Sequence, residues 1–241
     1  HNAVRMQLET VLMQSGIRPN MVTVMYDEKF DESAALADLF GFKTAKLSSS
    51  TKYVFQVQKA MEKVWDLYPE AKYVIVLEEE VILAPDFLMF MAQCLNPVDS
   101  DPTLIGISAW NENGYEGLST NPNLAYRVQV LPGLGFLLKK SFYLSHIKDN
   151  YQDCCIHRSW DGWMTGKLDN FEMIVPDVSR VYRRPYEGLS EQADLLTELF
   201  NRPRTTNLET KSVIQNWENL TYERYEEELS YLFKGGIALD T

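Results

Sequence analysis

The sequence has little cysteine, no long apolar stretch and a deficit of positive charge. Its three cysteines, at positions 94, 154 and 155, lack the CxxC and HxxxH spacings of zinc sites, which disfavours a structural zinc centre. Apolar runs such as Tyr73–Leu77 are far shorter than the roughly 20 residues that cross a bilayer. With 34 acidic and 23 basic residues, the net charge of −11 argues against a nonspecific grip on nucleic acid.

What remains is a chain with the composition of a folded domain. Its 241 residues are 45% hydrophobic and 24% charged, and we expect one domain over residues 1–241. Adjacent cysteines bridge each other only through a distorted ring, so Cys94 with Cys154 or Cys155 is the expected disulfide if one forms. The chain opens on His1, so we expect a fragment of a longer protein and draw nothing from the missing anchor.

Apolar runs alternate with helical patterns through the first 140 residues, which predicts an α/β fold with a mostly parallel sheet flanked by helices. Strands are expected at residues 21–26, 72–77 and 104–110, and helices at 3–14, 31–40 and from 51 onward. The helix at 3–14 has no strand before it to pack on, so the first strand of the fold is expected to be missing. A Tyr/Leu stripe between residues 208 and 233 is expected to be a helix that closes the core.

Glu78, Glu79 and Glu80 directly follow the predicted strand at 72–77. The carboxyl ends of strands in open α/β sheets form the ligand crevice, and carboxylates there can bind a hard divalent cation and, through it, a diphosphate. The alternative is a solvated acidic turn, because runs of like charge usually face water.

A second candidate is Trp160-Asp161-Gly162-Trp163, an acid between two indoles. An acid beside aromatic surface can have its pKa tuned and can take a proton from a hydroxyl. The alternative is a pair of core tryptophans with a capping aspartate. Arg180, Arg183 and Arg184 could offset phosphate charge, although surface ion pairs with the surplus acids are the favoured interpretation.

Five segments, taken in order and spacing, resemble the catalytic domain of the β-1,2-N-acetylglucosaminyltransferases. The likeness covers nearly the whole chain, and its O-mannose branch is closer than the N-acetylglucosaminyltransferase I branch. The segments are YPEAKYVIVLEEEVILAPDFLMFM, ISAWNENGYE, LAYRVQVLPGLGFLLKKS, SWDGWM and VPDVSRVY.

The resemblance implies a GT-A fold and an inverting transferase that uses UDP-GlcNAc and Mn²⁺. By position, Glu78 and Glu79 would contact the donor, as would Asp27, Trp160 and Ser190. Glu80 would bind the metal and Asp161 would be the general base. The implied acceptor is a mannose-bearing glycoprotein or glycopeptide, modified at the mannose 2-hydroxyl in the Golgi lumen. The full-length protein would then be a type II membrane protein, attached only through an N-terminal anchor.

Three positions depart from the family pattern. Glu80 stands where the family has Asp, Gln56 where it has a nucleotide-contacting His, and residues 183–185 replace an aromatic-Gly segment. These departures are what a rival hypothesis predicts, namely a catalytically inactive domain of the same fold that binds glycan or a partner protein. The rival does not require Asp161 to be present between its tryptophans.

Overall fold

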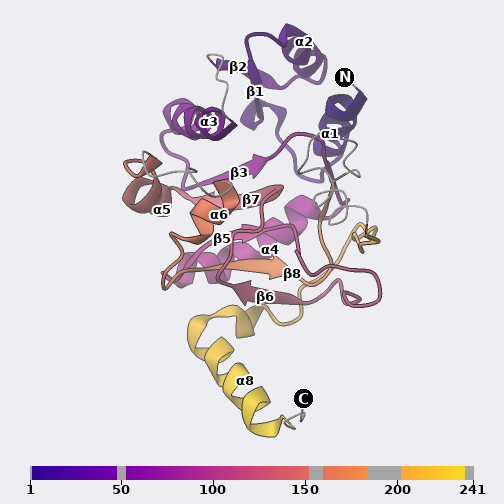
Figure 1. The fold of residues 1–241 in the computed structure, drawn as a ribbon. Helices are drawn as coiled ribbons and strands as arrows, with labels where there is room; N and C mark the ends of the chain where they lie inside the picture. Colours follow the sequence, from indigo (N-terminus) through magenta and orange to yellow (C-terminus); the bar gives the residue numbers. More distant parts are fainter. Residues whose placement is uncertain (1, 48–52, 152–159, 184–201, 237–241) are drawn as a thin grey trace.

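The computed structural model of the chain describes residues 2–47, 53–151, 160–183 and 202–236. Its centre is a five-stranded sheet of order β3-β7-β5-β8-β6, with two-stranded sheets β1-β2 and β4-β9 beside it (Figure 1). The strands are β1 (Thr23–Asp27), β2 (Lys43–Leu47), β3 (Tyr73–Leu77), β4 (Val81–Leu83), β5 (Leu104–Ser108), β6 (Ala125–Val128), β7 (Gly135–Lys139), β8 (Glu172–Pro176) and β9 (Val181–Arg183).

Helices flank this sheet, and the predicted α/β class is confirmed. The helical segments are α1 (Asn2–Leu12), η1 (Pro19–Met21), α2 (Asp31–Leu39), α3 (Tyr53–Leu67), α4 (Phe87–Ser100), α5 (Lys140–Phe142), η2 (Tyr143–Ile147), α6 (Trp160–Thr165), η4 (Trp217–Leu220) and α8 (Tyr222–Gly235). The architecture is compatible with a GT-A-like fold. No helix in the described part of the chain combines the length and apolarity that crossing a membrane requires.

The expected mostly parallel pairing is wrong for the central sheet. Only β5 and β8 pair in parallel, whereas β3 with β7, β7 with β5, and β8 with β6 are antiparallel. A continuous apolar run indicates burial on both faces but does not give strand direction. Because β7 runs against both of its neighbours, β3, β5 and β8 still share one direction, and their carboxyl ends lie at the same edge of the sheet.

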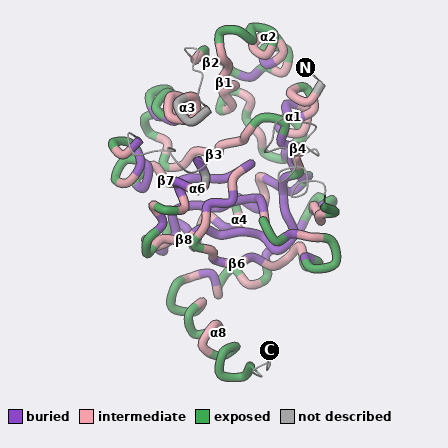
Figure 2. Tube along the Cα trace, viewed as in Figure 1, coloured by how far each residue is buried: buried purple, intermediate pink, exposed green. Residues whose placement is uncertain are grey.

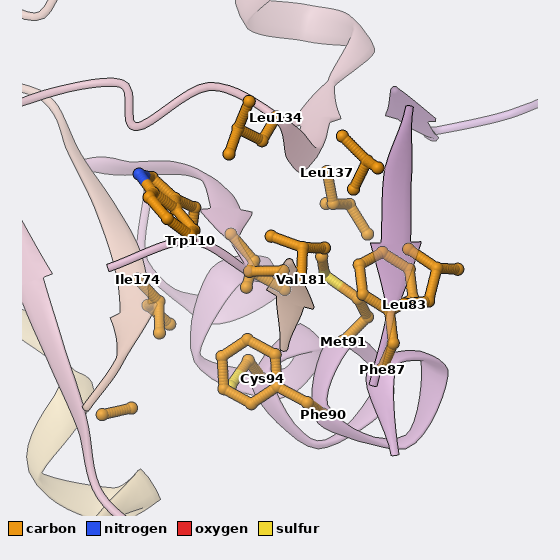
Figure 3. Packing of buried hydrophobic residues seen from close by; sticks show 14 of the residues in the cluster. Leu83, Phe87, Phe90, Met91, Cys94, Trp110, Leu134, Leu137, Ile174 and Val181 are labelled. Atoms are coloured by element: carbon orange, nitrogen blue, oxygen red, sulfur yellow. The ribbon is translucent and has the colours of Figure 1, made fainter. Parts of the chain in front are cut away.

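Two apolar clusters cover the two faces of this sheet. Leu137 of β7 faces a cluster with Phe90 and Cys94 of α4, shown in Figure 3, whereas Phe136 and Leu138 face a second cluster that contains α3 and α6 residues. This alternation follows from the two-residue period of a strand. Figure 2 shows the buried residues concentrated in these central strands. Cys94 is a free, buried thiol, so the expected disulfide is not formed by this residue.

The C-terminal helix contradicts its prediction. Helix α8 contains no buried residue, and Leu232 is 63% exposed. Figure 1 shows α8 (yellow) extending away from the sheet, so it does not close the core. The first turn of α8 is attached to the body, because the backbone N–H of Tyr222 donates to Asp101 Oδ2 at 2.9 Å and the hydroxyl of Tyr225 donates to the Arg127 carbonyl at 3.2 Å.

Candidate active site at the carboxyl edge of the sheet

The acidic turn follows β3 at the edge where β3, β5 and β8 end. Glu78 is half-buried, while Glu79 and Glu80 are exposed. The Glu78 backbone N–H donates to the Leu134 carbonyl at 2.8 Å, and its side-chain Oε1 accepts from the Leu134 N–H at 3.1 Å. Glu78 therefore extends the β3–β7 pairing by one residue and fixes the start of the turn to the loop that precedes β7.

Gly133 makes this contact possible. A Cβ atom at position 133 would lie 2.8 Å from Glu78 Oε1, closer than carbon and oxygen normally approach. On the other side of Glu78, the Arg183 guanidinium lies 4.0 Å from Oε2. The carboxylate of Glu78 is thus held between the loop at 131–134, which precedes β7, and the end of β9.

The turn itself is strained at Glu80, the predicted metal ligand. Its φ of 64° lies in the left-handed region that a residue with a side chain seldom adopts. The Gln7 side chain spans the turn, donating from Nε2 to the Glu78 carbonyl at 2.6 Å and accepting at Oε1 from the Glu80 N–H at 3.2 Å. Gln7 comes from α1, more than 70 residues away in sequence, and no sequence pattern indicated this contact.

Helix α6, which carries the predicted base Asp161, contacts the same loop as Glu78. The Leu131 N–H donates to Thr165 Oγ1 at 3.0 Å, and Trp160 stacks on Phe136 with ring centroids 5.7 Å apart. Phe136 pairs with Val76, two residues before Glu78. The structure therefore brings α6 and the acidic turn to one loop, although the Asp161 side chain lies outside the described atoms.

Both tryptophans of the WDGW segment are buried. Trp160 is 6% and Trp163 7% exposed, and Trp163 stacks on Tyr151 with ring centroids 5.5 Å apart. Burial also raises the pKa of the Tyr151 hydroxyl above its usual range, so this phenol is neutral at physiological pH. The indoles hold α6 onto the sheet, as the core interpretation of this segment expects. A donor-binding role for Trp160 stays a prediction.

The other segments that carried the resemblance meet at this edge as well. Ser108, the last residue of β5, donates from Oγ to the Pro132 carbonyl at 2.7 Å. The Asn111 amide donates to the Asp177 carbonyl at 2.7 Å, which joins the loop after β5 to the loop after β8. The ISAWNENGYE, PGLG and VPDVSR segments are therefore neighbours in space.

The predicted uracil contact, Asp27, ends β1 in a different sheet from Glu78. Its Oδ2 accepts a hydrogen bond from Gln56 Nε2 at 3.3 Å, so the residue that replaces the family histidine does contact the predicted nucleotide-binding acid. That Asp27 and the acidic turn contact the same nucleotide sugar stays a prediction. Ser190 lies outside the described residues.

The prediction for Arg180 is wrong, because its side chain is buried where it can neither reach a phosphate at the surface nor form a surface ion pair. Its side chain is fully buried, and its Nε lies 3.0 Å from Asp86 Oδ2, which is also fully buried. The guanidinium lies over the Phe90 ring and donates to the backbone carbonyls of Val178 and Pro122. It therefore joins the loops after β8 and before β6 to α4.

Within the described ranges, no group of three or more His, Cys, Asp or Glu side chains could hold a metal ion. A cation held at the acidic turn by one or two of its carboxylates would be completed by ligands outside the described residues, such as substrate phosphates. The exposed carboxylate of Glu80 fits that arrangement, since divalent ions are commonly held by one or two carboxylates together with substrate phosphates.

Comparison with known families decides the affiliation of this chain. Residues 44–200, well over half of its length, match the GNT-I family. The chain belongs to the GNT-I family. The matched region contains the acidic turn, the loop at 131–134 and α6, whereas Asp27 precedes it. The alpha-1,3-mannosyl-glycoprotein 2-beta-N-acetylglucosaminyltransferase of Arabidopsis thaliana is 32% identical over 119 residues. That alignment covers 48% of this GNT-I family chain and only 26% of the plant protein.

Proposed function

We propose that this GNT-I family chain is the catalytic domain of an inverting glycosyltransferase that uses UDP-GlcNAc. The acceptor is an O-linked mannose on a glycoprotein or glycopeptide in the Golgi lumen, and the new linkage is β-1,2. The observation that carries the proposal is the convergence of Glu78 and α6 on the loop at 131–134, at the edge where the strands end. The plant relative supports the sugar class, since its name describes addition of a 2-β-linked N-acetylglucosamine to a mannosyl glycoprotein.

In the proposed mechanism, the Asp161 carboxylate takes the proton from the mannose 2-hydroxyl. The oxygen then attacks the anomeric carbon of GlcNAc on the face opposite UDP, and the bond from that carbon to the diphosphate oxygen breaks with its electron pair going to UDP. A single displacement needs only one base and inverts the anomeric centre. Asp27, Glu78, Glu79, Trp160 and Ser190 orient the donor, which lowers the entropy cost of bringing the two sugars together.

Glu80 is the residue that would hold Mn²⁺ in this proposal. A bound divalent ion supplies positive charge to the diphosphate as it leaves. The Glu80 side chain is exposed and carries a hard oxygen donor, which suits such an ion. Glutamate in place of the family aspartate adds one methylene, and the left-handed backbone at position 80 changes the direction in which this longer side chain starts.

Calorimetric titration of UDP with and without Mn²⁺ tests the donor site. Binding should require the ion and should be lost in Glu80→Ala. Glu70→Ala is the matched control, because Glu70 is an exposed glutamate at the opposite end of β3. Binding of UDP that is equally strong without the ion, or in Glu80→Ala, would contradict the assignment.

A transfer assay separates the enzyme from the inactive-domain alternative. The two indoles are buried, so the WDGW segment offers little exposed surface on which a bound glycan could stack, whereas the substitutions at Gln56 and Glu80 are what the inactive-domain alternative predicts. Asp161→Asn should abolish GlcNAc transfer to a mannosyl peptide and leave UDP-GlcNAc affinity unchanged. Ion-dependent UDP binding with no transfer by the unmodified protein would instead favour the inactive domain.

A further inference from the structure

Three polar side chains in and just after α1 meet the body beside the buried apolar residues Leu8 and Val11. Gln7 and Thr10 lie three residues apart and so share one side of the helix, and Gln14 follows two residues after the helix ends at Leu12. Each contacts backbone that follows β3. Gln7 bonds Glu78 and Glu80, Thr10 Oγ1 accepts from the Leu83 N–H at 3.2 Å, and Gln14 reaches the start of α4. Helix α1 thereby supplies hydrogen bonds to a stretch of chain that begins at the acidic turn.

We propose that Gln7 is a positioning residue for the acidic turn, which sets the direction of the Glu80 carboxylate toward a divalent cation and the diphosphate it accompanies. The inference rests on the proposed function, and it assigns Gln7 no contact with either ligand. It follows from the two hydrogen bonds that Gln7 makes across the turn, on a residue that is only 9% exposed.

The chemistry of the glutamine side chain explains why this residue type fits. A primary amide carries a donor and an acceptor side by side, and here they meet a backbone carbonyl and a backbone N–H two residues apart. Holding both groups together keeps Glu80 at its φ of 64°. Without the amide, the backbone at Glu80 is free to return to a more common conformation, and its carboxylate then points elsewhere. Residues behind metal ligands act in this way by orienting the ligand.

Gln14, two residues after the end of α1, provides a matched control. Its Nε2 donates to the Ala84 carbonyl at 3.0 Å and its Oε1 accepts from the Leu88 N–H at 3.1 Å, so it also bridges two backbone groups. Gln14 is 4% exposed, and its partners lie beyond β4. Loss of Gln14 therefore removes a comparable pair of hydrogen bonds without touching the acidic turn.

The experiment measures UDP affinity in the presence of Mn²⁺ by calorimetry, together with thermal unfolding, for wild type, Gln7→Leu and Gln14→Leu. Both variants should unfold at lower temperature. Only Gln7→Leu should weaken ion-dependent UDP binding, by about 10–100-fold, whereas Gln14→Leu should stay within about twofold of wild type. Gln7→Asn keeps the amide on a shorter side chain that cannot span both groups. It should weaken binding by a smaller factor, and it replaces Gln7→Leu if that variant does not fold.

The outcomes are distinguishable. If wild type binds UDP with Mn²⁺ and the Gln7 variants bind equally well, the positioning role is overturned and the proposed function stands. Equal weakening in the Gln7 and Gln14 variants also overturns it, because the effect would then follow stability alone. If wild type shows no ion-dependent UDP binding, the proposed function fails and the role of Gln7 fails with it.

Discussion

The Arg127 side chain of β6 bonds several groups near the point where α8 begins. Its guanidinium is fully buried and lies 2.6 Å from Asp101 Oδ2 and 2.7 Å from Glu172 Oε2. It also donates to the Leu220 carbonyl at 2.8 Å and to Thr103 Oγ1 at 2.6 Å. One cation therefore pairs with two carboxylates and holds the segment that leads into α8.

We expect Arg127→Met to be strongly destabilising, because it leaves both carboxylates without their cation. The side chains of Asp101 and Glu172 are only 6% and 15% exposed, so water can replace little of what is lost. Removing one partner of a buried ion pair costs about 3–5 kcal/mol. At about 2–4 °C per kcal/mol for a domain of this size, Tm should fall by roughly 6–20 °C.

Urea unfolding followed by circular dichroism, with thermal unfolding beside it, measures this loss. Arg5→Met is the control, since Arg5 pairs with Glu9 at 3.7 Å with both side chains about half exposed, and it should change stability by less than about 0.5 kcal/mol. Adding Asp101→Asn and Glu172→Gln to Arg127→Met should recover part of the loss. A cost below about 1 kcal/mol for Arg127→Met would refute the view that the buried charges depend on this residue.

Three further predictions concern acid stability, thiol reactivity and loop packing. Burial alone would raise the pKa of Asp101, but hydrogen bonds from Thr103 and Arg127 outweigh it and lower the pKa below its usual value. Such a group stabilises the fold above its unfolded pKa, so this contribution to the free energy of unfolding should be lost as pH falls through the folded pKa. Arg127→Met should remove the part of that pH dependence that comes from Arg127 and leave the part that comes from Thr103. Burial raises the pKa of the Cys94 thiol to about 12, more than the charge of Arg180 lowers it. Iodoacetamide at pH 8 should therefore leave Cys94 unmodified in the native protein and label it in urea, as read by mass spectrometry, and rapid native labelling would contradict its burial. The Arg204 guanidinium lies 4.5 Å from the centre of the Trp110 ring and 4.3 Å from that of Tyr115. Arg204→Lys should therefore lower the free energy of unfolding in urea by about 1–2 kcal/mol. An unchanged urea midpoint would refute a stabilising role for this stacking.

The helices that the sequence predicted well are those whose signals are local. Helix α2 covers Asp31–Leu39, close to the helix expected at 31–40, and the left-handed φ of 72° at Gly41 is typical of a glycine that follows a helix end. The helix expected from residue 51 onward is α3 (Tyr53–Leu67), which supplies Met61 and Trp65 to the core. These signals depend on residues within a few positions of each other, so they are readable without tertiary contacts.

Strand direction and the location of α8 could not be read in the same way. Leu137 and Phe136 of β7 are as apolar as residues of a parallel strand, because burial on both faces needs the same side chains in either direction. In α8, Tyr225 and Leu229 follow a helical period, yet a period says only that one side of a helix differs from the other. The side of α8 that bears Tyr222 and Tyr225 meets the Arg127 guanidinium, with ring centroids 5.6 and 5.8 Å away.

The candidate site likewise combines residues that the sequence indicates with residues that only the structure reveals. Three adjacent glutamates after an apolar run are visible in the sequence, and the structure puts them at the predicted strand end. The residues that hold them are not visible. Gln7 is separated from the turn by more than 70 positions, and Gly133 matters only because Glu78 Oε1 occupies the space where its Cβ would be. No pattern among neighbouring residues in the sequence predicts either contact.

Contacts within the chain hold the acidic turn, and this bears on how it could bind a ligand. A left-handed residue with a side chain costs about 1–2 kcal/mol. At Glu80, the hydrogen bonds with Gln7 and the attachment of Glu78 to the loop at 131–134 offset that cost during folding. Because the backbone is already fixed, a cation would need to order only the Glu80 side chain, and preorganisation of this kind improves affinity. The site therefore depends on α1, β7 and the end of β9 as much as on the three glutamates themselves, since Gln7, Leu134 and Arg183 each hold a different part of the turn.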